Sequence, residues 1–131
     1  MSITVRTVRG ANELELEFPF TVDDANSAIR ELNGGSTNSV ALERDGNSLL
    51  IGNGPDEFTV TFIVGEMEHA YDLVGNADAE GSKEIMLGER TDWPIRFLVS
   101  RDVVERVARE FVETGSVKLG PEWEDQQAET S

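Results

Sequence analysis

Few residues of this 131-residue chain have side chains suited to catalysis, and their spacing builds no known catalytic site. The chain has one histidine, His69, and no cysteine, which excludes a histidine pair for a metal, a thiolate zinc site, a cysteine nucleophile and a disulfide. Ser39 and Ser100 lack the flanking glycines of a nucleophile elbow. We therefore predict a protein without catalytic residues that is not an enzyme.

The acidic residues offer the remaining routes to chemistry. The segment containing Asn76, Asp78 and Glu80 resembles the start of a calcium loop, but Leu87 stands at the twelfth position, where a bidentate glutamate is required. Carboxylate pairs such as Glu66 with Glu68 could do acid and base work, yet 26 acidic residues produce such pairs freely. We expect no metal and no cofactor. A small hydrolase with two perturbed carboxyl groups stays as an alternative.

The net charge and its distribution along the chain give more information about binding partners than any single acidic residue does. The chain has 11 Lys and Arg against 26 Asp and Glu, a net charge of −15, which excludes ordinary nucleic-acid binding through a basic surface. No Lys or Arg occurs between Arg44 and Lys83, where eight acids lie. One interpretation is solubility, and the other is a face that steers a basic partner.

On the second interpretation, acidic residues and two aromatic anchors would contact the partner. The predicted binding residues are Asp56, Glu57, Glu66, Glu68, Tyr71, Asp72, Asp78, Glu80 and Trp93. Neutralising Asp56, Glu57, Glu66 and Glu68 together should slow association without unfolding the protein.

The elements that must position these residues follow from periodicity. Alternating apolar residues predict strands over residues 3–8, 13–18, 58–64 and 69–74, with a hairpin around Asp45 and a short strand at 85–87. A capping box of Thr21 and Asp24 starts one helix, and a second runs over 101–114 between Ser100 and Gly115. A last strand is expected around 117–123. This order predicts an α+β fold, with a mainly antiparallel sheet of about five to seven strands and two helices packed on one face.

One domain over residues 1–123 and a polar tail over 124–131 account for the whole length. The first residues contain neither a continuous apolar run nor a cleavage site, and no stretch approaches a membrane span, so we expect a cytoplasmic protein without membrane contact.

The region of the last helix resembles a known family. Its motifs are Val103-Val104, Ala108-Arg109-Glu110-Phe111, Thr114-Gly115, Pro121 and Trp123, preceded by Leu50-Ile51-Gly52 with Gly54, and by the end of a strand at 71–75. Together they span residues 48–123 and are similar to the first immunity-protein family of bacterial polymorphic toxin systems. Members of that family are commonly encoded beside toxins with nucleic-acid deaminase domains. None of the motifs is catalytic.

The resemblance implies an immunity protein that binds a cognate toxin domain as a heterodimer and blocks its active site or substrate groove. It agrees with the charge, because a toxin that acts on nucleic acid needs a basic groove. The alternative is a DNA-mimicking inhibitor of a nuclease unrelated to a toxin locus.

Overall fold

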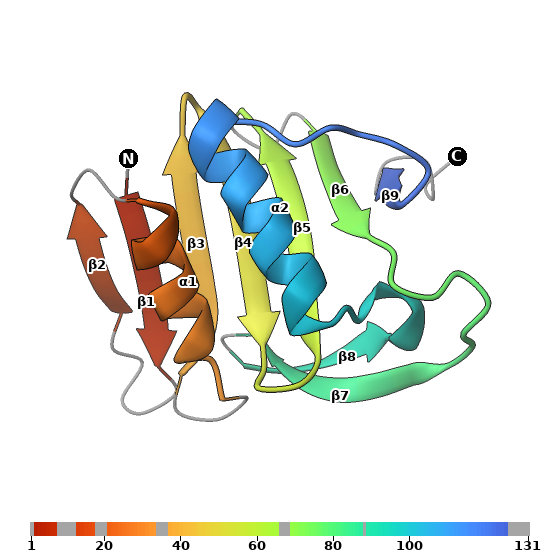
Figure 1. Cartoon of the computed structure of the whole chain (residues 1–131). Coiled ribbons are helices and arrows are strands. Elements are labelled where there is room, and N and C mark those ends of the chain that lie inside the picture. The colour runs from red at the N-terminus through yellow and green to blue at the C-terminus, as the bar shows by residue number, and fades with distance from the viewer. Residues whose placement is uncertain are drawn as a thin grey trace.

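The computed structural model describes residues 2–7, 13–17, 21–33, 37–65, 69–87 and 89–125, and it contains one large sheet, a separate hairpin and two α-helices in that part of the chain (Figure 1). The strands are β1 (Ser2–Thr7), β2 (Glu13–Glu17), β3 (Thr37–Arg44), β4 (Asn47–Asn53), β5 (Phe58–Val64), β6 (His69–Leu73), β7 (Ser82–Leu87), β8 (Glu89–Pro94) and β9 (Trp123–Asp125). The helices are α1 (Val22–Arg30), the short 3-10 helix η2 (Ile95–Phe97) and α2 (Arg101–Thr114).

The large sheet has seven strands in the order β2-β1-β3-β4-β5-β6-β9. Every neighbouring pair is antiparallel, and most pairs follow each other along the chain. The exceptions are β3, which returns beside β1 after α1, and β9, which returns beside β6 after α2. The predicted α+β fold with a mainly antiparallel sheet is confirmed.

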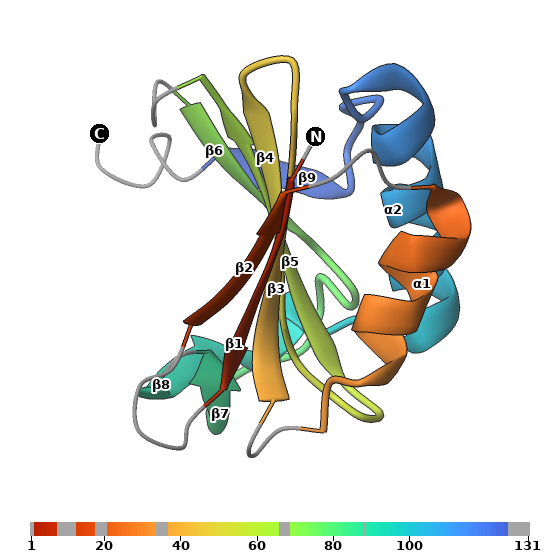
Figure 2. The ribbon, with the colours of Figure 1, turned by 90° about the vertical axis from the view of Figure 1, so that its left-hand side faces the viewer.

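Both α-helices cover one face of this sheet (Figure 2). The predicted capping box starts α1: the Thr21 hydroxyl accepts a hydrogen bond from the Asp24 amide at 3.3 Å, and the Asp24 carboxylate accepts one from the Thr21 amide at 2.9 Å. As expected, α2 begins after Ser100 and ends at Gly115, which takes the left-handed conformation at φ 76°. The Ser100 side chain, however, makes no capping hydrogen bond.

The core lies between the helices and the sheet. Alternate residues of the central strands point toward the helices, and Phe62 at the centre packs edge-on against Phe111 of α2 and Trp123 of β9, at ring-centroid distances of 6.2 and 6.3 Å. Trp123 is buried and belongs to this core. An ion pair between Arg30 and Glu105, 3.5 Å apart, joins the two helices at their surface.

The hairpin of β7 and β8 lies on the other face of the sheet, where Ile85 is buried (Figure 2). The short strand expected at 85–87 is longer, and β8 was not expected, because residues 89–92 are polar and give no apolar alternation.

The position expected for the last strand, 117–123, is wrong. A turn at Pro121 and Glu122 ends the irregular segment after α2, Leu119 is exposed, and β9 starts only at Trp123. The sheet therefore includes Glu124 and Asp125, which were expected to belong to the tail, while residues 126–131 lie outside the described residues. Among the described residues, no helix has both the length and the apolar character needed to cross a lipid bilayer.

Candidate binding surface

In the described part of the chain, no three His, Asp or Glu side chains lie close enough together to hold a metal ion. His69 is exposed and stacks on the ring of Tyr71, with 6.2 Å between centroids. The predicted binding residues are therefore the remaining candidate site.

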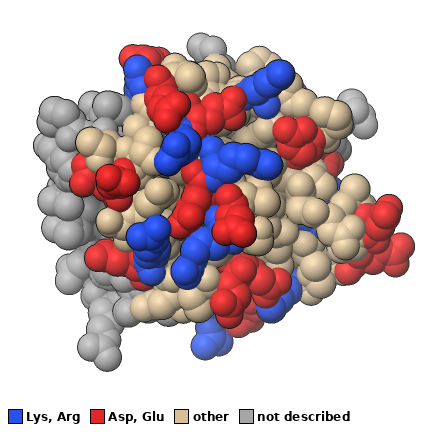
Figure 3. Space-filling view, in the orientation of Figure 1, with Lys and Arg blue, Asp and Glu red and all other residues tan. Residues whose placement is uncertain are grey.

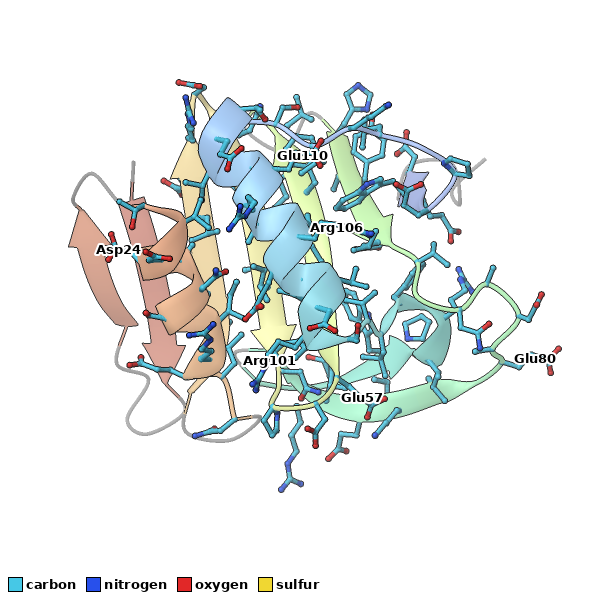
Figure 4. The ribbon with its side chains drawn as sticks, viewed as in Figure 1. Asp24, Glu57, Glu80, Arg101, Arg106 and Glu110 are labelled. Carbon is cyan, nitrogen blue, oxygen red and sulfur yellow. The ribbon has the colours of Figure 1, made fainter. Side chains whose placement is uncertain are left out.

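Five of those residues belong to segments that join or approach the large sheet at one end, the lower end in Figure 1. Because β5 and β6 are antiparallel, the loop that leads into β5 and the loop that follows β6 meet at the same end. The hairpin of β7 and β8 reaches this end too, because Lys83 of β7 forms an ion pair with Glu57 and lies opposite Trp93 of β8. These segments contain Asp56, Glu57, Asp78, Glu80 and Trp93, and Figure 4 shows Glu80 at the outer tip of its loop, well apart from Glu57.

The carboxylates at this end are not equivalent. Asp56, Asp78 and Glu80 are exposed, whereas Lys83 partly neutralises Glu57. Figure 4 shows Glu80 at the tip of the loop between β6 and β7, directed away from the body of the molecule. In the same loop, the Asp78 amide donates a hydrogen bond to the Asn76 side-chain oxygen at 3.1 Å.

Trp93 is half-buried and packs edge-on against Phe97, with 6.3 Å between ring centroids. Its indole nitrogen is buried, and the described residues offer it no hydrogen-bond acceptor. A buried indole N–H normally has a partner, and none of the described residues supplies one here. Its role as an anchor stays a prediction.

Tyr71 and Asp72 are neighbours in β6 and therefore lie on opposite faces of the sheet. Tyr71 is half-buried on the helix side, 6.5 Å from the ring of Phe62. Asp72 is only 6% exposed, and its carboxylate accepts a hydrogen bond from the Thr61 hydroxyl at 2.8 Å. Asp72 is therefore not part of the exposed acidic surface.

The other two predicted residues, Glu66 and Glu68, lie outside the described residues. They follow Gly65 at the end of β5, whereas Asp56 and Glu57 precede its start. The length of this strand, about 20 Å at the usual rise per residue, therefore separates the positions where the two acidic segments join it.

Negative charge is distributed unevenly over the layers. Residues 21–33 and 100–118, which contain the two helices, have seven acidic and five basic residues, whereas the rest of the chain has 19 acidic and six basic residues. Figure 3 shows acidic and basic side chains interleaved over the helices. Almost the whole net charge therefore belongs to the strands and the loops that join them.

A cavity of about 300 Å³ opens beside the acidic end, and no pattern in the sequence indicated it. Its apolar wall comes from three distant segments: Leu73 and Val74 at the end of β6, Leu98 and Val99 before α2, and Val103 in its first turn. Ser100, Arg106 and Glu122 add polar groups.

Main-chain contacts fix the shape of this cavity. The Val74 amide donates to the carbonyl of Glu122 at 2.6 Å, and the Gly75 amide donates to the carbonyl of Arg96 at 2.7 Å. Gly75 lies so close to the segment that precedes α2 that a Cβ atom on Gly75 would be 1.9 Å from the carbonyl oxygen of Leu98. Because only long-range contacts create the cavity, no local sequence pattern signals it.

Comparison with known proteins does not assign the surface. No protein-family model matches the chain, and no curated protein matches it significantly.

Proposed function

We propose that this protein is an immunity protein: it binds a basic toxin domain, of the nucleic-acid deaminase type, and blocks its active site or substrate groove. The resemblance of residues 48–123 to the immunity-protein family supports the proposal. The observation that carries it is the concentration of acid outside the helix layer, with exposed Asp56, Asp78 and Glu80 at one end of the sheet.

The physical reasoning starts from the toxin. A domain that acts on nucleic acid holds phosphates with Lys and Arg, and those cations attract the carboxylates of an inhibitor. The carboxylates speed association and orient the two proteins, while desolvated apolar contacts supply most of the affinity. No covalent bond is made or broken, so inhibition is stoichiometric.

Protection of the producing cell requires the free toxin to be scarce. A Kd of about 1 nM corresponds to about −12 kcal/mol, and a standard interface for such a complex buries about 1,600 Å² in total. The acidic end and the neighbouring cavity offer both parts of such an interface, charge at the rim and an apolar recess.

The test is co-expression with the C-terminal domain encoded by the neighbouring upstream reading frame. We expect the toxin domain alone to stop growth, this protein to restore it, and the two to purify as one complex. Absence of a toxic product at the locus, or free toxin after co-expression, would overturn the proposal. Inhibition of an unrelated nuclease without such a locus would instead favour the DNA-mimicking alternative.

A further inference from the structure

We infer that the cavity beside the end of β6 is the anchor point of the partner contact: it receives an apolar side chain that the basic partner presents between cationic residues. This inference rests on the proposed function and specifies which part of the surface supplies the affinity. The cavity, its rim charges and its position beside the acidic loop carry the argument.

The cavity is large enough to receive an anchor side chain, and apolar residues form part of its wall. Its volume, about 300 Å³, is at the lower end of the range for ligand sites, and Leu73, Val74, Leu98, Val99 and Val103 line it. Residues that dominate binding energy commonly insert large side chains into pockets of the partner. Because hydrogen-bonded main chain builds the recess, it is available without rearrangement, which lowers the entropic cost of binding.

Charges around the opening determine which partner fits. Glu122 is exposed at the rim, and Asp78 follows the wall residue Gly75 by three positions, which places their Cα atoms within about 11 Å of each other. Glu80 lies two residues further along the same loop. One carboxylate, Glu122, therefore lies at the opening, and Asp78 and Glu80 follow in the neighbouring loop, so an apolar side chain with a Lys or Arg placed toward Glu122 is favoured over one with an acid there.

One cation also borders the cavity. Arg106 is exposed on the flank of α2 that faces β6 (Figure 4), and among the described residues no carboxylate lies within ion-pair distance of it. Its guanidinium can donate to a main-chain carbonyl beside the inserted side chain. The opening thus offers attraction to cationic side chains and a donor for the partner's backbone.

The test measures binding of the purified toxin domain from the neighbouring reading frame to four variants of the full chain. Val103→Trp fills the cavity, and Glu122→Lys reverses a rim charge. Ser27→Trp and Glu31→Lys make the same two changes at exposed positions on and directly after α1, on the other side of the helix layer (Figure 1). Thermal unfolding monitors the fold of each variant.

We expect Val103→Trp to weaken binding at least tenfold, Glu122→Lys at least threefold, and both controls to bind like the parent chain. A folded Val103→Trp variant that binds within threefold of the parent overturns the inference. If that variant fails to fold, exposed Glu122 decides, and unchanged binding of Glu122→Lys then overturns it. A parent chain that does not bind the toxin at all refutes the proposed function instead, and the inference falls with it.

Discussion

Replacing three exposed carboxylates, Asp56→Asn, Asp78→Asn and Glu80→Gln, should slow association with the proposed toxin partner and leave the fold intact. All three side chains are exposed at the acidic end of the sheet, so each substitution should change stability by no more than about 0.5 kcal/mol. The expected effect lies in the rate constant for association, because charges at a rim act mainly on the encounter.

The size of the effect follows from Coulomb's law. Across about 8 Å of water at 0.01 M salt, each carboxylate attracts one partner cation by about 0.4 kcal/mol, so three contribute about 1.2 kcal/mol. Association should therefore slow about sevenfold. At 0.15 M salt, where the Debye length is about 8 Å, the same loss shrinks to about two- to threefold.

Stopped-flow fluorescence at both salt concentrations measures these rates. The matched control is Asp23→Asn, Asp102→Asn and Glu113→Gln, which removes the same charges from exposed positions in the helix layer. The first two acids lie in first helical turns, so this control should lose some stability but associate at nearly the parental rate. Equal slowing of association in both triple variants would show that the net charge, and not the position of the carboxylates, sets the rate. Unchanged association rates in both variants would refute electrostatic steering by these carboxylates.

Two further predictions concern the scaffold. Thr21→Ala should lower the free energy of unfolding by about 0.5–2 kcal/mol in urea denaturation, because it removes the capping hydrogen bond to the Asp24 amide. Ser100→Ala should lower the free energy of unfolding by less than Thr21→Ala does, since the Ser100 side chain makes no capping hydrogen bond. An equal loss for both substitutions would contradict the assignment of the side-chain cap to Thr21 alone. Gly75→Ala should destabilise the fold by about 1–3 kcal/mol or more, because the new Cβ meets the carbonyl of Leu98, and a parental unfolding midpoint would show that this approach relaxes freely.

Elements with strong periodicity could be predicted from the sequence. The β5 strand follows its alternating Phe58 to Val64 pattern, and α2 follows its apolar stripe between Ser100 and Gly115. These patterns work because each element buries one face against the same core. Polar strands give no such signal, which is why β8 was missed and β9 was placed too early.

The binding surface was predictable in part. Acidic residues around β5 and β6 were evident from the sequence, but whether they share one end of the sheet depends on strand direction, which places the loop with Asp56 and the loop with Asp78 at the same end. Burial of Asp72 depends on what lies over the second face of the sheet, and the cavity depends on the meeting of Leu73, Leu98 and Glu122. These features arise from contacts between distant segments, which local patterns do not encode.

The most direct test of neutralisation by stoichiometric binding is a titration of the toxin's enzymatic activity with this protein. The neighbouring toxin domain, held well above the expected Kd, should lose deaminase activity linearly and reach zero at one equivalent. Activity that persists at a tenfold excess of this protein would contradict the account.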